Sequence, residues 1–117
     1  MSATPFEQLA NLDRRVHDPA RLSILTALSA CERADFLFLQ RITGLTKGNL
    51  SSHLSKLEEA GLVEIEKRFV AKKTQTLVRL TDAGHQTIES YWRELEELRE
   101  SVARWQPQDV VAVPSPG

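Results

Sequence analysis

The chain has 117 residues with a formal net charge of −1, of which 41% are hydrophobic and 26% are charged. This length and composition indicate one small folded domain and exclude a disordered chain. The only cysteine, Cys31, cannot form an internal disulfide, no run of 18 apolar residues is present to span a membrane, and no secretory signal is visible. We therefore expect a cytoplasmic protein without a membrane partner.

Charge is distributed unevenly along the chain. Residues 1–45 are balanced, residues 46–80 carry seven basic and four acidic side chains, and residues 81–117 carry three basic and seven acidic ones. Charges more than about 8 Å apart are largely screened at physiological salt, so a polyanion responds to the local surplus rather than to the total. The middle segment can therefore attract nucleic acid although the whole chain is nearly neutral.

Apolar spacing predicts two helices in the N-terminal part. Apolar residues three and four positions apart, from Phe6 to Val16, predict a helix over residues 6–16. Asp18 is a favourable N-cap, and proline suits the first helical position. A second, more hydrophobic helix is therefore expected from Pro19 to about Ala30.

Two further helices are predicted with only residues 44–46 between them. Asp35 can cap the first, which ends at Gly44, and Thr46 can cap the second, which ends at Ala60–Gly61. The side chains expected to point inward are Phe36, Leu37, Leu39 and Ile42 in the first helix and Leu50, Leu54 and Leu57 in the second. A turn of this length, with a glycine, is typical of a helix–turn–helix.

A hairpin and a last helix complete the predicted domain, residues 1–105. Strands are predicted over residues 62–68 and 76–80, with a basic loop over residues 69–75 between them. Thr81 can cap a helix whose apolar residues follow a heptad seam: Ile88, Tyr91, Leu95, Leu98, Val102 and Trp105. The proline-rich residues 106–117 are expected to form a flexible tail.

The helix after Thr46 has the polarity that a DNA-reading helix needs. Its leucines occupy one narrow side, and small hydrogen-bonding residues lie opposite, towards its N-terminal end. Short Ser and Thr side chains allow close approach, Asn can read adenine, and Lys can contact phosphate or guanine. The candidate DNA-binding residues in this helix are Thr46, Lys47, Gly48, Asn49, Ser51, Ser52, Ser55 and Lys56. A helix face that is merely solvated is the simpler interpretation of these residues taken alone.

Three segments carry a resemblance to a known family: His17–Leu25, Leu50–Val63 and Leu80–Gly84. Over residues 17–92 the chain resembles the winged helix–turn–helix regulators of the MarR/ArsR-like superfamily, in particular small stand-alone winged-helix proteins. The resemblance implies a mainly α fold with a small β-hairpin (α+β), flanked by N- and C-terminal dimerisation helices. It also implies a recognition helix over residues 46–60 for the major groove.

The same resemblance implies a wing around residues 68–76, where Arg68, Lys72 and Lys73 would contact the DNA backbone. The expected function is a homodimeric, sequence-specific regulator of transcription, a repressor, that reads a near-palindromic site in double-stranded DNA. The expected dimer-interface residues are Phe6, Leu9, Ile88, Tyr91, Trp92, Leu95, Leu98, Val102 and Trp105. The alternative is a winged-helix module that binds protein or RNA without specific DNA binding.

No residue pattern points to an enzyme, a cofactor or a metal site. A Gly-rich phosphate loop, a Gly-x-Ser-x-Gly motif and a Cys-x-Cys pair are absent, and the three histidines are scattered. Cys31 is either a small residue between helices or a redox sensor. Trp92 and Trp105 either pack in the dimer interface or line a pocket for a small-molecule effector, whose identity is unknown.

Overall fold

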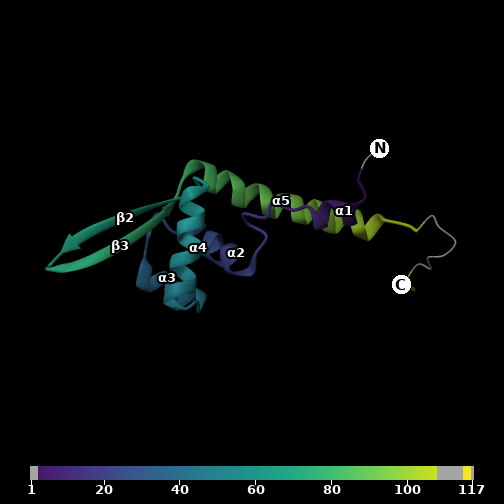
Figure 1. The fold of residues 1–117 in the computed structure, drawn as a ribbon. Helices are drawn as coiled ribbons and strands as arrows, with labels where there is room; N and C mark the ends of the chain where they lie inside the picture. Colours follow the sequence, from purple (N-terminus) through teal and green to yellow (C-terminus); the bar gives the residue numbers. More distant parts are fainter. Residues whose placement is uncertain (1–2, 108–114, 117) are drawn as a thin grey trace.

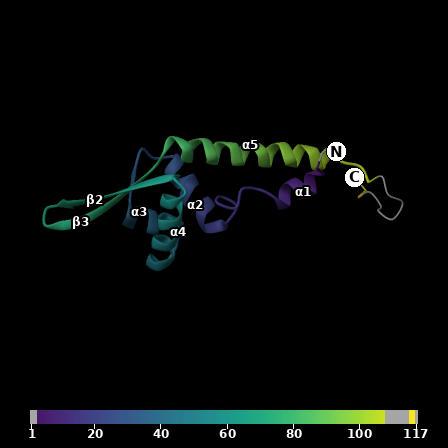
Figure 2. The ribbon, with the colours of Figure 1, turned by 45° about the horizontal axis from the view of Figure 1, so that its top comes forward.

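The structure, a computed structural model, describes residues 3–107 and 115–116 (Figure 1). Its elements are α1 (Pro5–Ala10), α2 (Pro19–Ser29), β1 (Ala34–Asp35), α3 (Phe36–Thr43), α4 (Lys47–Glu59), β2 (Val63–Val70), β3 (Lys73–Leu80) and α5 (Asp82–Arg104). The strands form an antiparallel sheet in the order β1-β3-β2. The molecule measures 69 × 25 × 21 Å because the β2–β3 hairpin and the far part of α5 extend in opposite directions from a small helical body (Figure 2).

The hydrophobic core joins the inward faces of the helices to the sheet. Its largest fully buried side chains include Ile24, Leu25, Leu28, Leu39, Leu50, Leu57, Leu62 and Ile88. Burying a side chain of this size stabilises the fold by about 1.5–3 kcal/mol. Leu50 and Leu57 of α4 are among these residues, so the core fixes which side of α4 faces outward.

Four predicted N-caps are confirmed. The Asp18, Asp35, Thr46 and Thr81 side chains each accept a hydrogen bond from a backbone N–H two or three residues further on. Such a cap typically stabilises a helix by about 1 kcal/mol. The bond from the Arg21 amide, the largest contribution, holds the pKa of Asp18 below its usual value. These caps place the starts of α2, α3, α4 and α5 where the sequence predicts them.

The predicted helix over residues 6–16 is wrong beyond Ala10. Asn11 ends α1, and its side-chain amide donates to a backbone oxygen of the last turn at 2.8 Å. Asparagine favours such local bonds over continuing a helix. Leu12 and Val16 are still buried, because a turn rather than helical spacing brings both to the core.

The inward face of α3 is narrower than the sequence predicts. Leu39 is fully buried and Phe36 is half-buried, as expected, but Leu37 is 66% exposed and Ile42 is 49% exposed. Leu37 lies roughly 160° around the helix from Leu39 at about 100° per residue. The prediction is therefore wrong for Leu37, which points outward, and for Ile42, which lies on an uncovered flank.

The hairpin is longer and its turn tighter than predicted. The strands pair residue by residue from Val63 with Leu80 to Val70 with Lys73, so the expected loop over residues 69–75 is mostly strand. Ala71 (φ 50°) and Lys72 (φ 66°) make the turn in the left-handed region. A two-residue type I′ turn requires this conformation, but glycine and asparagine are its usual residues. An Ala-Lys pair therefore gave no turn signal.

The two strands and α5 meet at one corner of the molecule. Thr81 Oγ1 donates to Gly61 O at 2.6 Å, and the Thr81 amide donates to Leu62 O at 3.1 Å. A Cβ on Gly84 would lie 2.1 Å from the same Leu62 oxygen, so only glycine allows this approach. The corner fixes the hairpin relative to α4.

β1, which pairs Ala34 with Val78, was not predicted, since two residues are too few to show a strand pattern. The predicted tail over residues 106–117 lies largely outside the described residues, which omit 108–114 and 117. In the described part of the chain, no helix has both the length and the apolar character needed to cross a membrane.

Candidate nucleic-acid interface

The predicted DNA-reading residues of α4 all lie at the surface. Leu50, Leu54 and Leu57 are buried beneath them. The exposed residues are Thr46, Lys47, Gly48, Asn49, Ser51, Ser52, Ser55 and Lys56. The face thus offers hydroxyls, one amide and two ammonium groups, without an exposed large apolar side chain.

The turn before α4 presents the start of the helix to solvent. Gly44 ends α3 in the left-handed conformation, with φ 70°, and its amide donates to Gln40 O at 3.0 Å. Thr46 Oγ1 accepts from the Asn49 amide at 3.1 Å. The amides of Lys47 and Gly48, in the first turn, have no partner within the helix, so this end favours an anion. No heavy atom lies within 4 Å of a Cβ built on Gly48, so its own chain does not require glycine there.

A groove of about 590 Å³ separates α4 from the hairpin. Its lining residues are Phe36, Lys47, Ser51, Leu54, Ser55, Glu58, Ile65, Lys67 and Thr76. Lys67 was not among the predicted site residues. The alternation of β2 could have identified it, because Lys67 shares a strand face with Val63 and Ile65. The groove therefore adds a second lysine from the hairpin to Lys47 of α4.

The predicted wing cations occupy different places. Arg68 lies on the opposite face of β2 from Lys67 and donates through Nε to Glu66 Oε1 at 2.9 Å. This bond to Arg68 is the main reason that the pKa of Glu66 is lowered. Lys72 and Lys73 are exposed at the hairpin tip and form no ion pair with the described residues. The uncompensated positive charge of the wing therefore lies at its tip and on its α4-facing side.

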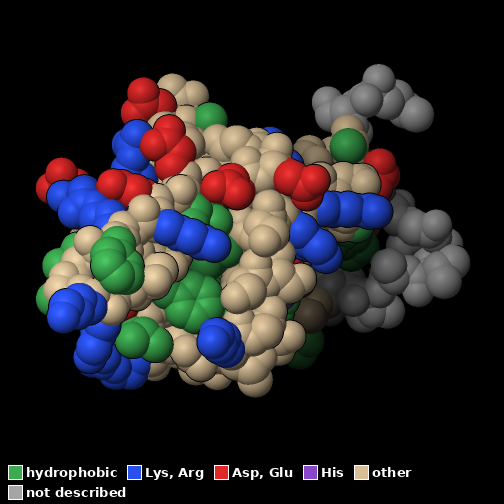
Figure 3. Space-filling model, turned by 60° about the vertical axis from the view of Figure 1, so that its left-hand side comes forward, with side chains coloured by type: hydrophobic (Ala, Val, Ile, Leu, Met, Phe, Trp, Pro, Cys, Tyr) green, Lys and Arg blue, Asp and Glu red, His purple; other side chains and the backbone are tan. Residues whose placement is uncertain are grey.

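Acidic side chains are unevenly distributed on the face seen from the hairpin end. Most Asp and Glu side chains lie in its upper part, with Lys and Arg among them, whereas the lower part carries Lys and Arg side chains with few acidic ones (Figure 3). Residues 46–80, which contain α4 and the hairpin, carry seven basic and four acidic side chains. A polyanion is therefore attracted to this part of the surface.

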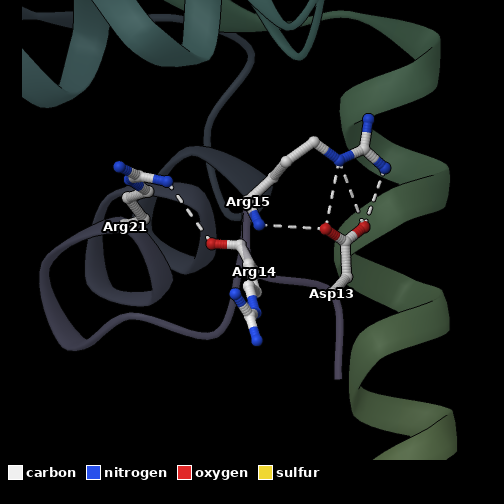
Figure 4. A network of polar contacts seen from close by, with 4 residues as sticks. All are labelled: Asp13, Arg14, Arg15 and Arg21. Atoms are coloured by element: carbon white, nitrogen blue, oxygen red, sulfur yellow. Dashed lines mark hydrogen bonds and ion pairs between the residues drawn. The ribbon is translucent and has the colours of Figure 1, made fainter. Parts of the chain in front are cut away.

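Arg21 connects α4 to the helix behind it. Its Nε donates to His53 Nδ1 at 3.3 Å. Its Nη1 donates to Arg14 O at 3.3 Å, as Figure 4 shows. Beside it, Arg15 binds Asp13 through the side chain and the amide, and the side-chain bond is the main cause of the lowered pKa of Asp13. His53 is half-buried and packs between helices. These contacts hold α4 against α2 and the segment before it.

The predicted dimer-interface residues fall into two groups, one buried and one exposed or half-buried. Ile88, Tyr91 and Leu98 are buried within one protomer, so the prediction that they face a partner is wrong. Tyr91 shows the reason, since α5 packs on the body of its own chain and the tyrosine OH is 2.8 Å from His17 Nδ1. Burial raises the pKa of Tyr91. The remaining predicted residues are exposed or half-buried: Phe6, Leu9, Trp92, Leu95, Val102 and Trp105.

These six residues form the α1/α5 patch. The Phe6 and Trp105 rings meet edge to face with centroids 5.0 Å apart, so α1 covers the end of α5 only in part. A groove of about 530 Å³ lies between the helices, lined by Leu9, Trp92, Leu95, Glu96, Leu98, Arg99 and Val102. Exposed apolar residues gathered in this way mark an interaction surface.

Other candidate chemistry is sparse. Cys31 is a free, half-buried thiol. Among residues 3–107 and 115–116, no three His, Cys, Asp or Glu side chains come close enough to hold a metal ion.

Residues 20–99 match the family described as winged helix DNA-binding domain. The uncharacterized protein MJ0432 of Methanocaldococcus jannaschii is 34% identical over 82 residues, which are 70% of this chain and 89% of that protein. The uncharacterized HTH-type transcriptional regulator YdgJ of Bacillus subtilis is 34% identical over 79 residues, 68% of this chain. The match covers 48% of YdgJ, so this chain spans about half of its length.

Solved structures show the same fold. A transcriptional regulator homologue from Pyrococcus horikoshii OT3 superposes with a TM-score of 0.76 at 28% identity, covering 84% of this chain and 96% of that one. An ArsR family regulator and a putative MarR-like regulator share the fold at 24% and 18% identity, with TM-scores of 0.53 and 0.62. The predicted mainly α fold with a small hairpin and the resemblance to winged-helix proteins are thereby confirmed, and the ArsR family and MarR-like structures share this fold.

Proposed function

Because this chain belongs to the winged helix DNA-binding domain family, we propose that it is a regulator of transcription that binds specific sequences in double-stranded DNA. The observation that carries this proposal is the exposed N-terminal half of α4. Serine, asparagine and lysine side chains surround unpartnered amides there, beside a groove whose lining includes Lys47 and Lys67 together with Glu58. This is the chemistry that phosphates and base edges require.

In this proposal α4 enters the major groove with its N-terminal end first. Gly48 and Ser52 let the helix approach closely, since neither carries a bulky side chain. Asn49 can bond an adenine edge through two hydrogen bonds, and Lys47 and Lys56 can contact phosphate or guanine. Glu58 and Glu59 lie at the far end of α4, away from the entering turn.

The hairpin supplies contacts to the DNA backbone. Lys67 faces the groove beside α4, and Lys72 and Lys73 extend the positive charge to the tip. Arg68, paired with Glu66 on the other face, contributes less, because its charge is already partly compensated. Phosphate contacts position the protein on the duplex, and the contacts of α4 with base edges supply the sequence preference.

The α1/α5 patch supports a homodimer. An exposed apolar surface at the end of a long helix is well suited to pack against a second copy, which buries the same surface on both chains. Two-fold symmetry would then present two α4 helices to half-sites about 34–36 Å apart, hence a near-palindromic site. Such a dimer would act as a cytoplasmic repressor by covering a promoter, through binding alone and without catalysis.

Two other roles remain as outcomes of the test. Binding of a protein partner at α4 is disfavoured by its lack of exposed large apolar anchors. RNA binding would use the same cations without a palindromic duplex. A small-molecule effector in the groove between α1 and α5 would modify DNA binding rather than replace it.

Selection of genomic fragments by the full chain at about 150 mM salt tests the proposal, since nonspecific binding weakens steeply with salt. We expect enrichment of a few duplex fragments that share a near-palindromic sequence. Enrichment of no sequence, or preference for single-stranded RNA over every duplex, would contradict it.

A matched pair of variants then locates the reading surface. Asn49→Ala on α4 should relax the preference at one base pair of each half-site, at a cost of about 1–3 kcal/mol. Gln86→Ala removes the same type of group from an exposed position of α5 and should change neither affinity nor preference. Equal effects of the two variants would place the reading surface elsewhere.

A further inference from the structure

The tip of the hairpin exposes an aromatic ring that nothing in its own chain covers. Phe69 is 75% exposed and Val70 is 52% exposed, and Phe69 is the most exposed large hydrophobic side chain of the described residues. Both residues therefore contribute less to stability through burial than a core residue does. Phe69 and Val70 lie four and five residues beyond Ile65, directly before the turn, and two adjacent exposed apolar side chains there indicate a contact with a partner outside the chain.

The ring lies on the side of the hairpin that faces the proposed DNA site. Side chains alternate along a strand, so Phe69 shares a face with Ile65 and Lys67, which line the groove beside α4. Its cross-strand partner, Thr74, extends the same face. Val70 points to the opposite face, where Arg68 and Glu66 form their ion pair.

The turn makes this tip narrow and places two lysines at its end. Ala71 and Lys72 both adopt positive φ, which costs each non-glycine residue about 1–2 kcal/mol. Lys72 and Lys73 are exposed beside the apolar pair. Seen from the hairpin end, hydrophobic side chains lie among Lys and Arg side chains (Figure 3).

The length of the hairpin fits the distance between adjacent grooves of DNA. Eight residues of β2 extend about 26 Å at about 3.3 Å per residue. The minor groove next to a major groove lies about half of one helical repeat away, or roughly 17 Å. The hairpin is therefore long enough to reach the neighbouring minor groove when α4 lies in the major groove.

We propose that Phe69 is an apolar wedge that enters the minor groove, partly separates two stacked base pairs and bends the duplex. Apolar side chains inserted between base steps act in this way, and flexible pyrimidine–purine steps are the easiest to open. Lys72, in the turn, and Lys73, which pairs with Val70 on the other face, add positive charge at the tip that attracts the DNA phosphates. The wedge would make the protein favour a deformable step that α4 never touches. This inference rests on the proposed DNA-binding function.

The test uses the duplex selected by the full wild-type chain, with a fluorescent adenine analogue placed at each candidate minor-groove step. Emission of the analogue rises when its base unstacks. We expect a rise at one step per half-site with the wild type, and little rise with Phe69→Ala. The affinity of Phe69→Ala should fall about tenfold, within the range measured for base–aromatic stacking, while the salt dependence stays the same because no charge is lost.

Two variants control for size and position. Phe69→Leu keeps an apolar wedge and should retain most of the unstacking signal. Val70→Ala shortens an exposed apolar side chain on the opposite face of the same tip and should behave as the wild type. All three variants should keep the wild-type melting temperature, because the altered side chains are exposed.

The outcomes separate this inference from the function on which it rests. If the wild type selects no duplex, both fail. If it selects a duplex but unstacks no base, or if Phe69→Ala binds and unstacks as the wild type does, the wedge is wrong and the DNA-binding function stands. If Phe69 instead contacts a protein partner or a lipid surface, Phe69→Ala should bind and unstack the duplex as the wild type does.

Discussion

At the hairpin end of the molecule, α4 and β2–β3 expose hydroxyls, an amide and lysines, whereas at the opposite end α1 and α5 expose Phe6, Leu9 and Trp105. The far half of α5 also carries the acidic side chains Glu94, Glu96, Glu97 and Glu100. DNA is therefore attracted to one end and repelled from the other. Both ends expose apolar side chains, Phe69 and Val70 at the hairpin tip and the α1/α5 patch at the far end. The two ends support different partners within a single small chain.

The largest expected effect comes from charging the α1/α5 patch. Leu9→Glu combined with Val102→Glu places carboxylates on two residues that are each 41% exposed, so the fold should survive. We expect sedimentation to show a monomer and the affinity for the selected duplex to fall about 100-fold, because linked binding of two half-sites is lost. Leu98 is unsuitable for this test, since it is buried in its own protomer.

The matched control for this variant is Leu37→Glu, which charges a 66% exposed leucine on α3 instead. It should leave the dimer unchanged. A wild type that sediments as a monomer, or a double variant that remains a dimer, would show that the α1/α5 patch has another role.

The next largest effect is expected on the stability of the fold, at the corner where the two strands meet α5. Gly84→Ala should destabilise the fold by about 2 kcal/mol, since its Cβ would lie 2.1 Å from the Leu62 carbonyl oxygen and the backbone must shift. Urea unfolding followed by circular dichroism measures this change. Equal stability of Gly84→Ala and the wild type would mean that the corner adapts without cost.

Removing the tip cations should affect DNA binding alone. For Lys72→Ala with Lys73→Ala, we expect affinity for all duplexes to fall about tenfold and the salt slope to decrease by about two units, one for each lost phosphate contact. Anisotropy titrations over a range of salt concentrations measure the slope. The control, Arg14→Ala with Arg93→Ala, also removes two positive charges, but from exposed positions outside the hairpin. It should keep the wild-type salt slope. Equal slopes for all three proteins would exclude the tip from the interface.

The smallest effect is expected at Gly48. A Cβ there meets no atom of its own chain, so Gly48→Ala should leave stability unchanged or slightly increased, since alanine favours a helix. Affinity for the selected duplex should fall several-fold, because the new methyl group occupies the surface that DNA approaches. Unchanged affinity would mean that the start of α4 stays away from the duplex.

The elements with strong local signals were predictable from the sequence. Asp18, Thr46 and Thr81 fix helix starts through side-chain bonds to nearby amides, and the leucine spacing of α4 fixes its buried side. The exposed side of α4, and with it the candidate site in that helix, follows from the same spacing.

The remaining features depend on contacts between distant residues. The two-residue turn at Ala71–Lys72 has no sequence signature, so the length of the wing and the tip position of Phe69 could not be predicted. The heptad seam of α5 reveals which residues are apolar, but not that Ile88 and Leu98 face their own protomer. Tertiary packing decides which apolar side of a helix its own chain covers.

Amide chemical shifts of the full chain, followed by NMR as the selected duplex is added, test the division between the two ends most directly. We expect the largest shift changes in residues 46–56 and 67–76, with small changes in α1 and the far half of α5. Changes centred on α5, with residues 46–56 unaffected, would contradict it.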